Sequence, residues 1–178
     1  MPASWLALIL LLQQTPQTTT PPTANTQGPP RTPPSGQRPP TREDLLRGDY
    51  SRWRANNDLL SYHLDIRVDP DKKSIAGKNT IRFKMLKDDT RIQLDLFDTL
   101  TIDKIQLENV TLKYTREVHT VYVDFPSTLK AGRTYAIDFY YSGTPSSQGR
   151  FDGFSFRKDA EGHTWITTAC EGVGARLW

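Results

Sequence analysis

Apolar residues recur at every second position through most of the chain after residue 58. In the first such run, Tyr62, Leu64, Ile66 and Val68 alternate with polar residues. This spacing predicts a half-buried strand, because successive side chains of a strand point to opposite faces. Helical periodicity is nearly absent. We therefore predict an all-β fold, an antiparallel β-sandwich or saddle-like sheet of about eight to ten short strands.

The remaining strands are expected wherever the alternation resumes. The stretch "DPDKK" at residues 69–73 has turn chemistry, so the runs on either side of it are predicted to form an antiparallel pair. The later runs are Ile81/Phe83/Met85, Ile92/Leu94/Leu96, Leu100/Ile102, Ile105/Leu107, Leu112/Tyr114, Val121/Val123/Phe125 and Tyr135/Ile137/Phe139/Tyr141, and a last apolar segment runs from Trp165 toward Ala169. Together they assign residues 59–178 to one β-domain.

Residues 41–58 are a lead-in to this domain that we expect to be short and helical, or irregular. Thr41 is followed three residues later by Asp44. This is the spacing of a capping box, in which a hydroxyl and an acid satisfy the first backbone donors of a helix. We predict one short helix or helical turn at this place.

The first 14 residues look like an export signal. Trp5 to Leu12 is an apolar run of eight residues, long enough for a secretory signal core but far short of the roughly 20 residues that cross a bilayer as a helix. Met1 to Ser4 carries no Lys or Arg, which also fits a start codon assigned inside a longer signal. By either route we expect an exported protein, periplasmic or extracellular, with no stable membrane span after signal removal.

Residues 15–40 are predicted to be a disordered Pro/Thr-rich linker. The stretch from 13 to 40 holds nine of the chain's 13 prolines and no large apolar side chain. Such a segment cannot bury enough apolar surface to offset the entropy of ordering it. We expect an extended spacer without chemistry of its own.

The charges and the single cysteine exclude several classes of protein. Two of the 23 basic residues lie before residue 41, where there is no acid, which leaves 21 basic against 20 acidic residues in the remainder. This balance argues against a nucleic-acid partner. Because Cys170 has no second cysteine to pair with, an internal disulfide framework and a multi-cysteine zinc site are excluded.

The residues by themselves do not assemble a complete active site. The three histidines, His63, His119 and His163, have no second histidine at metal-ligand spacing. No His-Glu-x-x-His, glycine-rich phosphate loop or Gly-x-Ser-x-Gly sequence occurs. His63 and His119 lie on the polar faces of their predicted strands, so we expect both to face solvent. We therefore name no catalytic residue and no metal ligand.

Four stretches of the sequence, taken in their order along the chain, are more specific than the composition or the strand pattern. They are "LLSYHLDIRVDPDKKSIAGKNTIRFK" (59–84), "IQLDLFDTLTIDKI" (92–105), "LKAGRTYAIDFYYSGTP" (129–145) and "WITTACEGVGAR" (165–176). In this order they resemble the N-terminal domain of the zinc aminopeptidases of peptidase family M1, which includes aminopeptidase N and leukotriene hydrolase. The positions that fill the family's opening Tyr-x-Leu-x-Ile and Gly-x-x-x-Ile/Phe strands are Tyr62, Leu64, Ile66, Gly77, Ile81 and Phe83. The resemblance covers residues 59–178.

The resemblance implies a role for Glu171. In the family, the residue after the cysteine is a Glu or Gln that reaches into the active-site cleft and holds the free α-amine of the substrate, and Glu171 follows Cys170. A carboxylate suits this task because a charge-assisted hydrogen bond is about twice as strong as a neutral one. Without the resemblance, Glu171 would be interpreted as a surface acid near a strand end. Ala169 stands where many members carry a substrate-lining Gln, so no side-chain preference is implied.

The resemblance places the zinc ligands, the general base and the transition-state tyrosine beyond the position of Trp178. Zinc is therefore implied only for a catalytic domain that is missing from this chain. Our first hypothesis is a non-catalytic N-terminal domain, truncated before the catalytic domain, that walls the cleft of an exported aminopeptidase. Alone it is expected to be inactive, and it would bind a peptide N-terminus only together with a catalytic domain.

Two alternatives stay open. One is a stand-alone secreted β-sandwich that binds a ligand or partner, and the other is a structural or adhesion module on a proline-rich stalk. An apolar patch near Trp165 to Trp178, larger than the roughly few hundred Å² that monomers usually expose, would favour the first hypothesis. A polar surface there would favour the alternatives.

Overall fold

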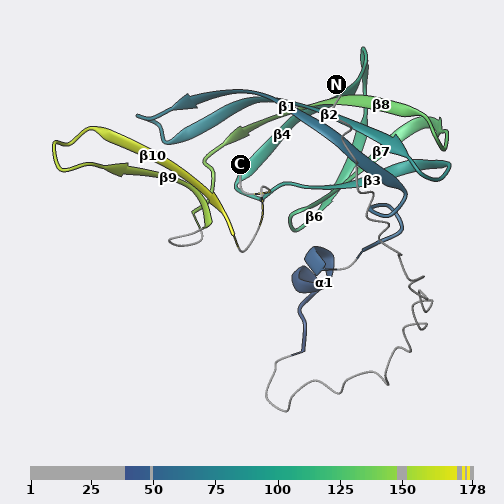
Figure 1. Ribbon diagram of the computed structural model, residues 1–178, viewed down its shortest axis with the longest axis horizontal. Helices are drawn as coiled ribbons and strands as arrows, with labels where there is room; N and C mark the ends of the chain where they lie inside the picture. The colour runs from purple at the N-terminus through teal and green to yellow at the C-terminus, as the bar shows by residue number, and fades with distance from the viewer. Residues whose placement is uncertain (1–38, 49, 148–151, 172–173, 175, 177–178) are drawn as a thin grey trace, which may run out of the picture. The chain divides into compact units, whose positions relative to one another are not determined.

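The computed structural model describes residues 39–48, 50–147, 152–171, 174 and 176 (Figure 1). The predicted signal segment (1–14) and nearly all of the predicted linker (15–40) lie outside the described residues, so both stay predictions. Within the described part, no helix is long and apolar enough to span a membrane. The described elements are a short helix followed by antiparallel strands, which confirms the all-β prediction.

Helix α1 (Arg42–Gly48) begins where the capping box predicts it. The Thr41 hydroxyl accepts the backbone N–H of Asp44 at 3.2 Å, and the Asp44 carboxylate accepts the backbone N–H of Thr41 at 2.8 Å. Two backbone donors at the start of the helix are thereby satisfied. An ion pair of 2.6 Å between Arg42 Nε and Glu117 Oε1 joins the helix to the end of β6 (Lys113–Glu117).

Five strands form the larger sheet, sheet A, in the order β1-β2-β8-β4-β5, and each neighbouring pair is antiparallel. The predicted pairing of the first two strands is confirmed, with Tyr62 opposite Ile81 and Leu64 opposite Asn79. The strands are β1 (Asn57–Asp69), β2 (Ser74–Met85), β8 (Thr134–Gly143), β4 (Leu100–Leu107) and β5 (Val110–Thr111). Strand β1 is therefore an edge of sheet A.

The two short runs predicted over residues 100–107 form one strand, β4. Its register against β8 shifts between Ile102 and Lys104. Ile102 and Ile105 are both buried although they are three positions apart, because an irregularity of this kind adds a residue and changes which positions face the core. The break in the twofold spacing marks this shift and not the end of a strand.

Three further strands form sheet B in the order β3-β7-β6, again antiparallel. Besides β6 they are β3 (Asp89–Asp95) and β7 (Thr120–Leu129). The chain passes from sheet A to sheet B at Leu112, which lies between β5 and β6 and is buried. The strand predicted over Leu112 and Tyr114 therefore begins one residue after this crossing.

A third sheet of two strands, β9 (Asp152–Lys158) and β10 (Thr164–Cys170), forms a hairpin. Strand β10 confirms the strand predicted from the run that starts at Trp165. Strand β9 is an element that the sequence analysis misses, although Phe154 and Phe156 alternate around Ser155. Phe154 is buried in the main core and Phe156 packs against it, so the root of the hairpin is part of the domain.

A single hydrophobic core joins sheets A and B, which confirms the sandwich architecture. Residues that face one another in sheet A, such as Ile81 and Ile137, belong to the same buried cluster as Ile92 and Val123 of sheet B. Burial of this kind stabilises a domain by about 25 cal/mol for each Å² of apolar surface removed from water.

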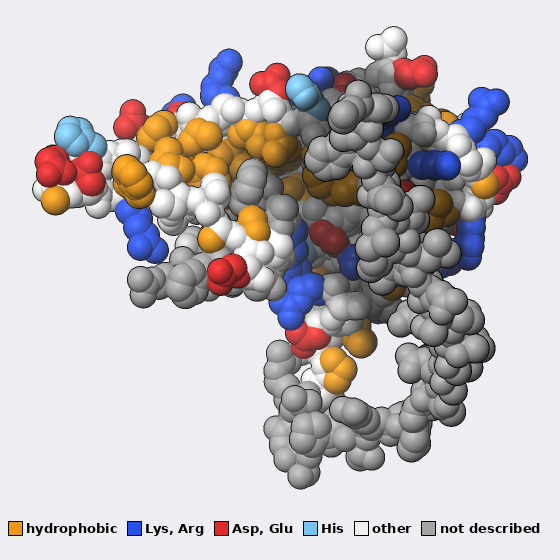
Figure 2. Space-filling model, viewed as in Figure 1, with side chains coloured by type: hydrophobic (Ala, Val, Ile, Leu, Met, Phe, Trp, Pro, Cys, Tyr) orange, Lys and Arg blue, Asp and Glu red, His pale blue; other side chains and the backbone are white. Residues whose placement is uncertain are grey.

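Among the described residues, none covers the inner face of sheet A completely along β1. Tyr62 and Leu64 point to the same side as the buried Ile81 because directly opposed residues of an antiparallel pair share a face, yet they are 51% and 45% exposed. Figure 2 shows hydrophobic side chains gathered where Figure 1 places β1, β2 and β10. Trp165 and Ile166 of β10 are exposed as well, so exposed apolar side chains occur in the expected region and extend to β1.

Candidate functional site

Glu171 directly follows β10, at the root of the β9–β10 hairpin. Its side chain is exposed, and none of the described residues forms an ion pair or a hydrogen bond with its carboxylate. The preceding Cys170 is exposed and Ala169 is half-buried. The residue that the sequence analysis singles out is thus an accessible carboxylate at a strand end.

The root of the hairpin is fixed by a close backbone contact at Gly153, which lies opposite Ala169. Gly153 has a φ of 97°, and a Cβ atom there would lie 2.1 Å from the carbonyl oxygen of Ser146. The backbone N–H of Phe154 donates to that same carbonyl at 3.0 Å. Only glycine combines this φ with such an approach, so the position of the strand pair that leads to Glu171 is defined.

Beyond Glu171 in the sequence, Arg176 is bound by the loop between β3 and β4. The backbone N–H of Phe97 donates to the Arg176 carbonyl oxygen at 2.7 Å, and the Arg176 guanidinium carbon lies 5.7 Å from the centroid of the Phe97 ring. Arg176 Nη2 is 3.5 Å from Glu43 Oε1 on α1. We call Glu43, Phe97, His119 and Arg176 the Arg176 cluster. In the sequence, Glu171 therefore lies between two positions that are held by contacts, the root of the β9–β10 hairpin and Arg176.

His119 belongs to this cluster, and the prediction that it faces solvent is wrong. It is 6% exposed, and its ring stacks on Phe97 with 4.0 Å between centroids. Nδ1 accepts the backbone N–H of Asp98 at 3.1 Å, so the neutral ring carries its proton on Nε2, 3.3 Å from Glu43 Oε1. Burial and then the positive charge of Arg176 lower the pKa of His119, against the opposing charges of Asp98 and Glu43.

The strand pattern misplaces His119 because the residue lies in the turn between β6 and β7 and not on a strand face. In a turn, the alternation of polar and apolar positions carries no information about burial. His63, which does lie on a strand (β1), is exposed as predicted.

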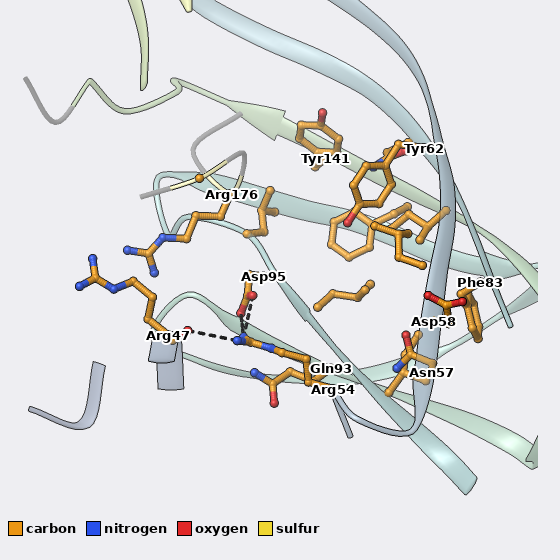
Figure 3. Close-up of a pocket in the computed structure, with 18 of the residues that line it drawn as sticks. Arg47, Arg54, Asn57, Asp58, Tyr62, Phe83, Gln93, Asp95, Tyr141 and Arg176 are labelled. Carbon is orange, nitrogen blue, oxygen red and sulfur yellow. Dashed lines mark hydrogen bonds and ion pairs between the residues drawn. The ribbon is translucent and has the colours of Figure 1, made fainter. Parts of the chain in front are cut away.

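A cavity of about 610 Å³ lies beside the edge strands β1 and β3 (Figure 3). Tyr62 and Leu64 of β1 and Phe139 and Tyr141 of β8 contribute to its apolar wall. Burial raises the pKa of Tyr141 to about 12. The strand pattern alone does not predict this cavity, and the unusual feature in the sequence is Asn79, a polar residue at an inner-face position of β2.

One end of the cavity is charged. Arg54 Nη2 lies 3.0 and 2.8 Å from the two carboxylate oxygens of Asp95 and also donates to the carbonyl of Leu46. Burial raises the pKa of Asp95, while the charges of Arg54 and Arg176 oppose this effect. Arg47 and Arg176 also line the cavity, and Figure 3 shows them on the same side as Arg54 and Asp95. Among the described residues, Asp95 pairs with Arg54 and Glu43 pairs with Arg176, so Arg47 leaves an excess positive charge at this end.

Potential metal ligands come together in the turn between β9 and β10, where Asp159, Glu161 and His163 are exposed and have ligand atoms within 4.8 Å of one another. Asp159 Oδ1 accepts the backbone N–H groups of Glu161 and His163 at 3.1 and 2.7 Å, so this carboxylate organises the turn. Catalytic zinc sites take two or three His or Cys ligands in a cleft. This set, with one imidazole on an exposed turn, does not fit a catalytic zinc ion.

Comparison with known proteins agrees with this architecture. The sequence profile of the peptidase M1 N-terminal domain matches residues 59–178, the range of the predicted β-domain. None of the curated proteins compared with the chain matches it.

Two solved structures illustrate the structural similarity, and both are of mutants. One is a two-domain M1 zinc metallopeptidase bound to L-arginine, with 23% identity and a TM-score of 0.55. The other is an M1 zinc metallopeptidase from Deinococcus radiodurans bound to a Tyr-Ser-Ala substrate, with 22% identity and a TM-score of 0.54. Each match covers 70% of this chain and 28% of the other. At this identity the similarity shows a shared fold, and the chain spans little more than a quarter of those proteins.

Proposed function

The chain belongs to the peptidase M1 family, and we propose that its β-domain walls the active-site cleft of a zinc aminopeptidase, where Glu171 binds the free α-amine of the substrate. The M1 N-terminal domain occupies residues 59–178. The observation that carries the proposal is the position of Glu171, an exposed carboxylate without a partner among the described residues. It lies between the hairpin root at Gly153 and the bound Arg176.

The chemistry of an ammonium ligand supports this role. An exposed carboxylate that makes no internal ion pair is available to accept charge-assisted hydrogen bonds from a substrate ammonium. The contacts at Gly153 and at Arg176 hold the described chain near Glu171 in place, which reduces the ordering cost on binding. Gly174, three residues further on, has a φ of 72°, a conformation that glycine adopts without strain.

Zinc belongs to the solved M1 relatives, and the described residues of this chain do not offer a set of ligands that fits it. In the proposed enzyme, the zinc ligands and the general base come from protein outside residues 1–178. The chain by itself would then contribute the cleft wall and Glu171 and would not hydrolyse peptides.

The proposal is tested in the protein that carries both domains. The coding sequence that continues the reading frame of Trp178 should encode a His-Glu-x-x-His sequence. In that protein, Glu171→Ala should raise KM for an aminoacyl p-nitroanilide roughly 10- to 100-fold, since a hydrogen bond to a charged group contributes about 1.5–3 kcal/mol. Glu161→Ala, which removes an exposed acid in the β9–β10 turn, is the matched control and should leave KM unchanged.

Two results would contradict different parts of the proposal. An unchanged kcat/KM in Glu171→Ala would exclude the substrate-binding role of Glu171. A coding sequence without the zinc motif would exclude the cleft-wall role and favour a stand-alone binding module.

A further inference from the structure

The cavity beside β1 and β3 has the size and the walls of a small-molecule site. Its volume of about 610 Å³ is in the middle of the range of roughly 300–1,000 Å³ that ligand pockets occupy. The apolar wall includes Tyr62 and Leu64, which lie on the inner face of sheet A and remain about half exposed. Phe139 and Tyr141 continue this wall on β8. An apolar ligand body would cover side chains that nothing else in the described part of the chain covers.

Buried polar atoms without partners coincide with this cavity. In the described part of the chain, the buried side-chain atoms that lack a hydrogen-bond partner are Asn79 Oδ1, Gln93 Nε2 and Arg176 Nε. All three residues line the cavity. An unsatisfied buried group of this kind costs about 1–3 kcal/mol. Gln93 also borders a second cavity of about 200 Å³ beneath α1, so Asn79 and Arg176 are the two residues whose unpartnered atoms belong to the first cavity alone.

Arg176 Nε and Asn79 Oδ1 require opposite hydrogen-bond partners. Arg176 Nε is a donor on a side chain that is 9% exposed, and the ion pair of this guanidinium with Glu43 uses Nη2 at 3.5 Å. Asn79 Oδ1 is an acceptor within the apolar wall, between Leu64 and Phe139 in the register of sheet A. A ligand that satisfies both atoms needs an acceptor at one end and a donor further along its length.

The charge at the polar end selects an anion. Figure 3 shows Arg47 and Arg176 on the side of the cavity away from Tyr62 and Tyr141, with Arg54 bound to Asp95. Since Arg54 and Asp95 neutralise each other, a carboxylate would meet the guanidinium of Arg47, which has no acidic partner among the described residues, and the Nε donor of Arg176. Guanidinium groups bind carboxylates through parallel N–H bonds.

We propose that this cavity binds an amphipathic carboxylate, a small molecule with an anionic end, a hydrogen-bond donor further along its length and an apolar tail. N-acyl amino acids have this chemistry. The carboxylate lies at Arg47 and Arg176, the amide N–H donates to Asn79 Oδ1, and the acyl chain covers the wall formed by β1 and β8. This site goes beyond the proposed aminopeptidase role and does not use Glu171.

The test is a calorimetric titration of the full chain with three probes below their micelle concentrations. N-decanoylglycine is expected to bind tightest, at one saturable site. Decanoic acid lacks the amide donor and should bind about tenfold more weakly. N-decanoylglycinamide lacks the negative charge, and its affinity should be lower by about tenfold or more, because one hydrogen bond to a charged group corresponds to at least that factor.

Variants locate the site. Arg47→Gln removes an exposed guanidinium and should weaken N-decanoylglycine binding about tenfold or more, as should Arg176→Gln. Because Arg176 also contacts Glu43 and Phe97, Arg47→Gln keeps the test valid if the Arg176 variant fails to fold. Asn79→Val should remove the difference between N-decanoylglycine and decanoic acid. Arg67→Gln, an exposed charge on the outer face of β1, is the matched control and should bind as the unmodified chain does.

Three results would overturn the proposal. They are the absence of saturable binding, equal affinity for all three probes, and binding that neither arginine variant weakens. The last two would indicate adsorption to the exposed apolar face and not a site. Retained binding in Glu171→Ala is expected, so failure of the aminopeptidase role and failure of this site give different results.

Discussion

Two parts of the same face of sheet A differ in how they are covered. Leu64, Asn79, Phe139 and Ile105 lie in one row across β1, β2, β8 and β4. At the β4 and β8 end of the row, Ile105 is 0% and Phe139 is 4% exposed, whereas Leu64 at the β1 end is 45% exposed. The sandwich is thus closed over β8 and β4 and open along β1. The apolar face of a strand therefore need not be part of the core.

The closed part should provide most of the stability, and this is the largest effect we predict. Ile137→Ala removes a side chain with no exposed surface on β8 and should lower the free energy of unfolding by about 2–5 kcal/mol. Leu64→Ala, an apolar truncation of the same size class on the open edge, should cost about 1 kcal/mol or less. Urea unfolding curves measure both. Equal losses in the two variants would mean that β1 is covered as completely as β8.

A glycine determines how closely the open strand approaches its neighbour. Gly77 lies opposite Ile66, and a Cβ atom there would lie 2.1 Å from the carbonyl oxygen of Asp65 and 2.8 Å from the Cα of Ile66. Gly77→Ala must therefore move β1 away from β2, at a cost of about 1–3 kcal/mol. Hydrogen exchange should become faster in β1 while sheet B is unchanged. Ala76→Ser, at the exposed neighbouring position, is the control, and faster exchange throughout both sheets would contradict a local effect.

Alternation in the sequence was sufficient to predict most strands, because β2, β7 and β8 each have one face with buried side chains and apolar residues also alternate on the open strand β1. For this reason β2, β7 and β8 lie where the pattern places them. Strand β9 (Asp152–Lys158) contains Gly153, whose close contact with Ser146 exists only in the folded chain, so the sequence did not reveal this strand. The register shift in β4 has the same origin, since pairing with β8 and not local preference determines it.

The candidate sites were less predictable than the fold. Glu171 could be named from the order of the motifs, and its accessibility agrees with that prediction without testing its role. The cavity could not be named, because it depends on β1 and β3 being edge strands of different sheets. The burial of His119 depends on Phe97 and Glu43, which are distant in the sequence. Contacts between residues that are distant in the sequence produce no periodic pattern of apolar positions.

Two histidines extend the comparison to pH, with the smallest expected effect. The pKa of the buried His119 is lowered from an ordinary value of about 6.5, so the unfolded chain binds more protons just below that pH. Stability should therefore be complete above about pH 6.5 and should decrease as the pH falls through the folded pKa. Glu117 and Asp88 have lowered pKa values, and their contribution is lost only below about pH 4.

Unfolding midpoints between about pH 7 and pH 5 measure this effect. His119→Gln should flatten the decrease over this range. His63→Gln, which changes the exposed histidine on the open strand β1, should keep it. A midpoint that rises on acidification, or the same slope in both variants, would show that His119 does not cause the pH dependence.

The Arg176 cluster has a mechanical consequence. Through Glu43 and the Phe97 backbone, it joins the helix that precedes the sheets to a residue that follows them. The segment between Glu43 and Arg176, which contains the strands, is therefore a loop whose two ends are held together by these contacts. A pulling force applied to the two ends of the chain would act first on the contacts of the Arg176 cluster. It would reach the hydrogen bonds between strands only after these few polar contacts had broken.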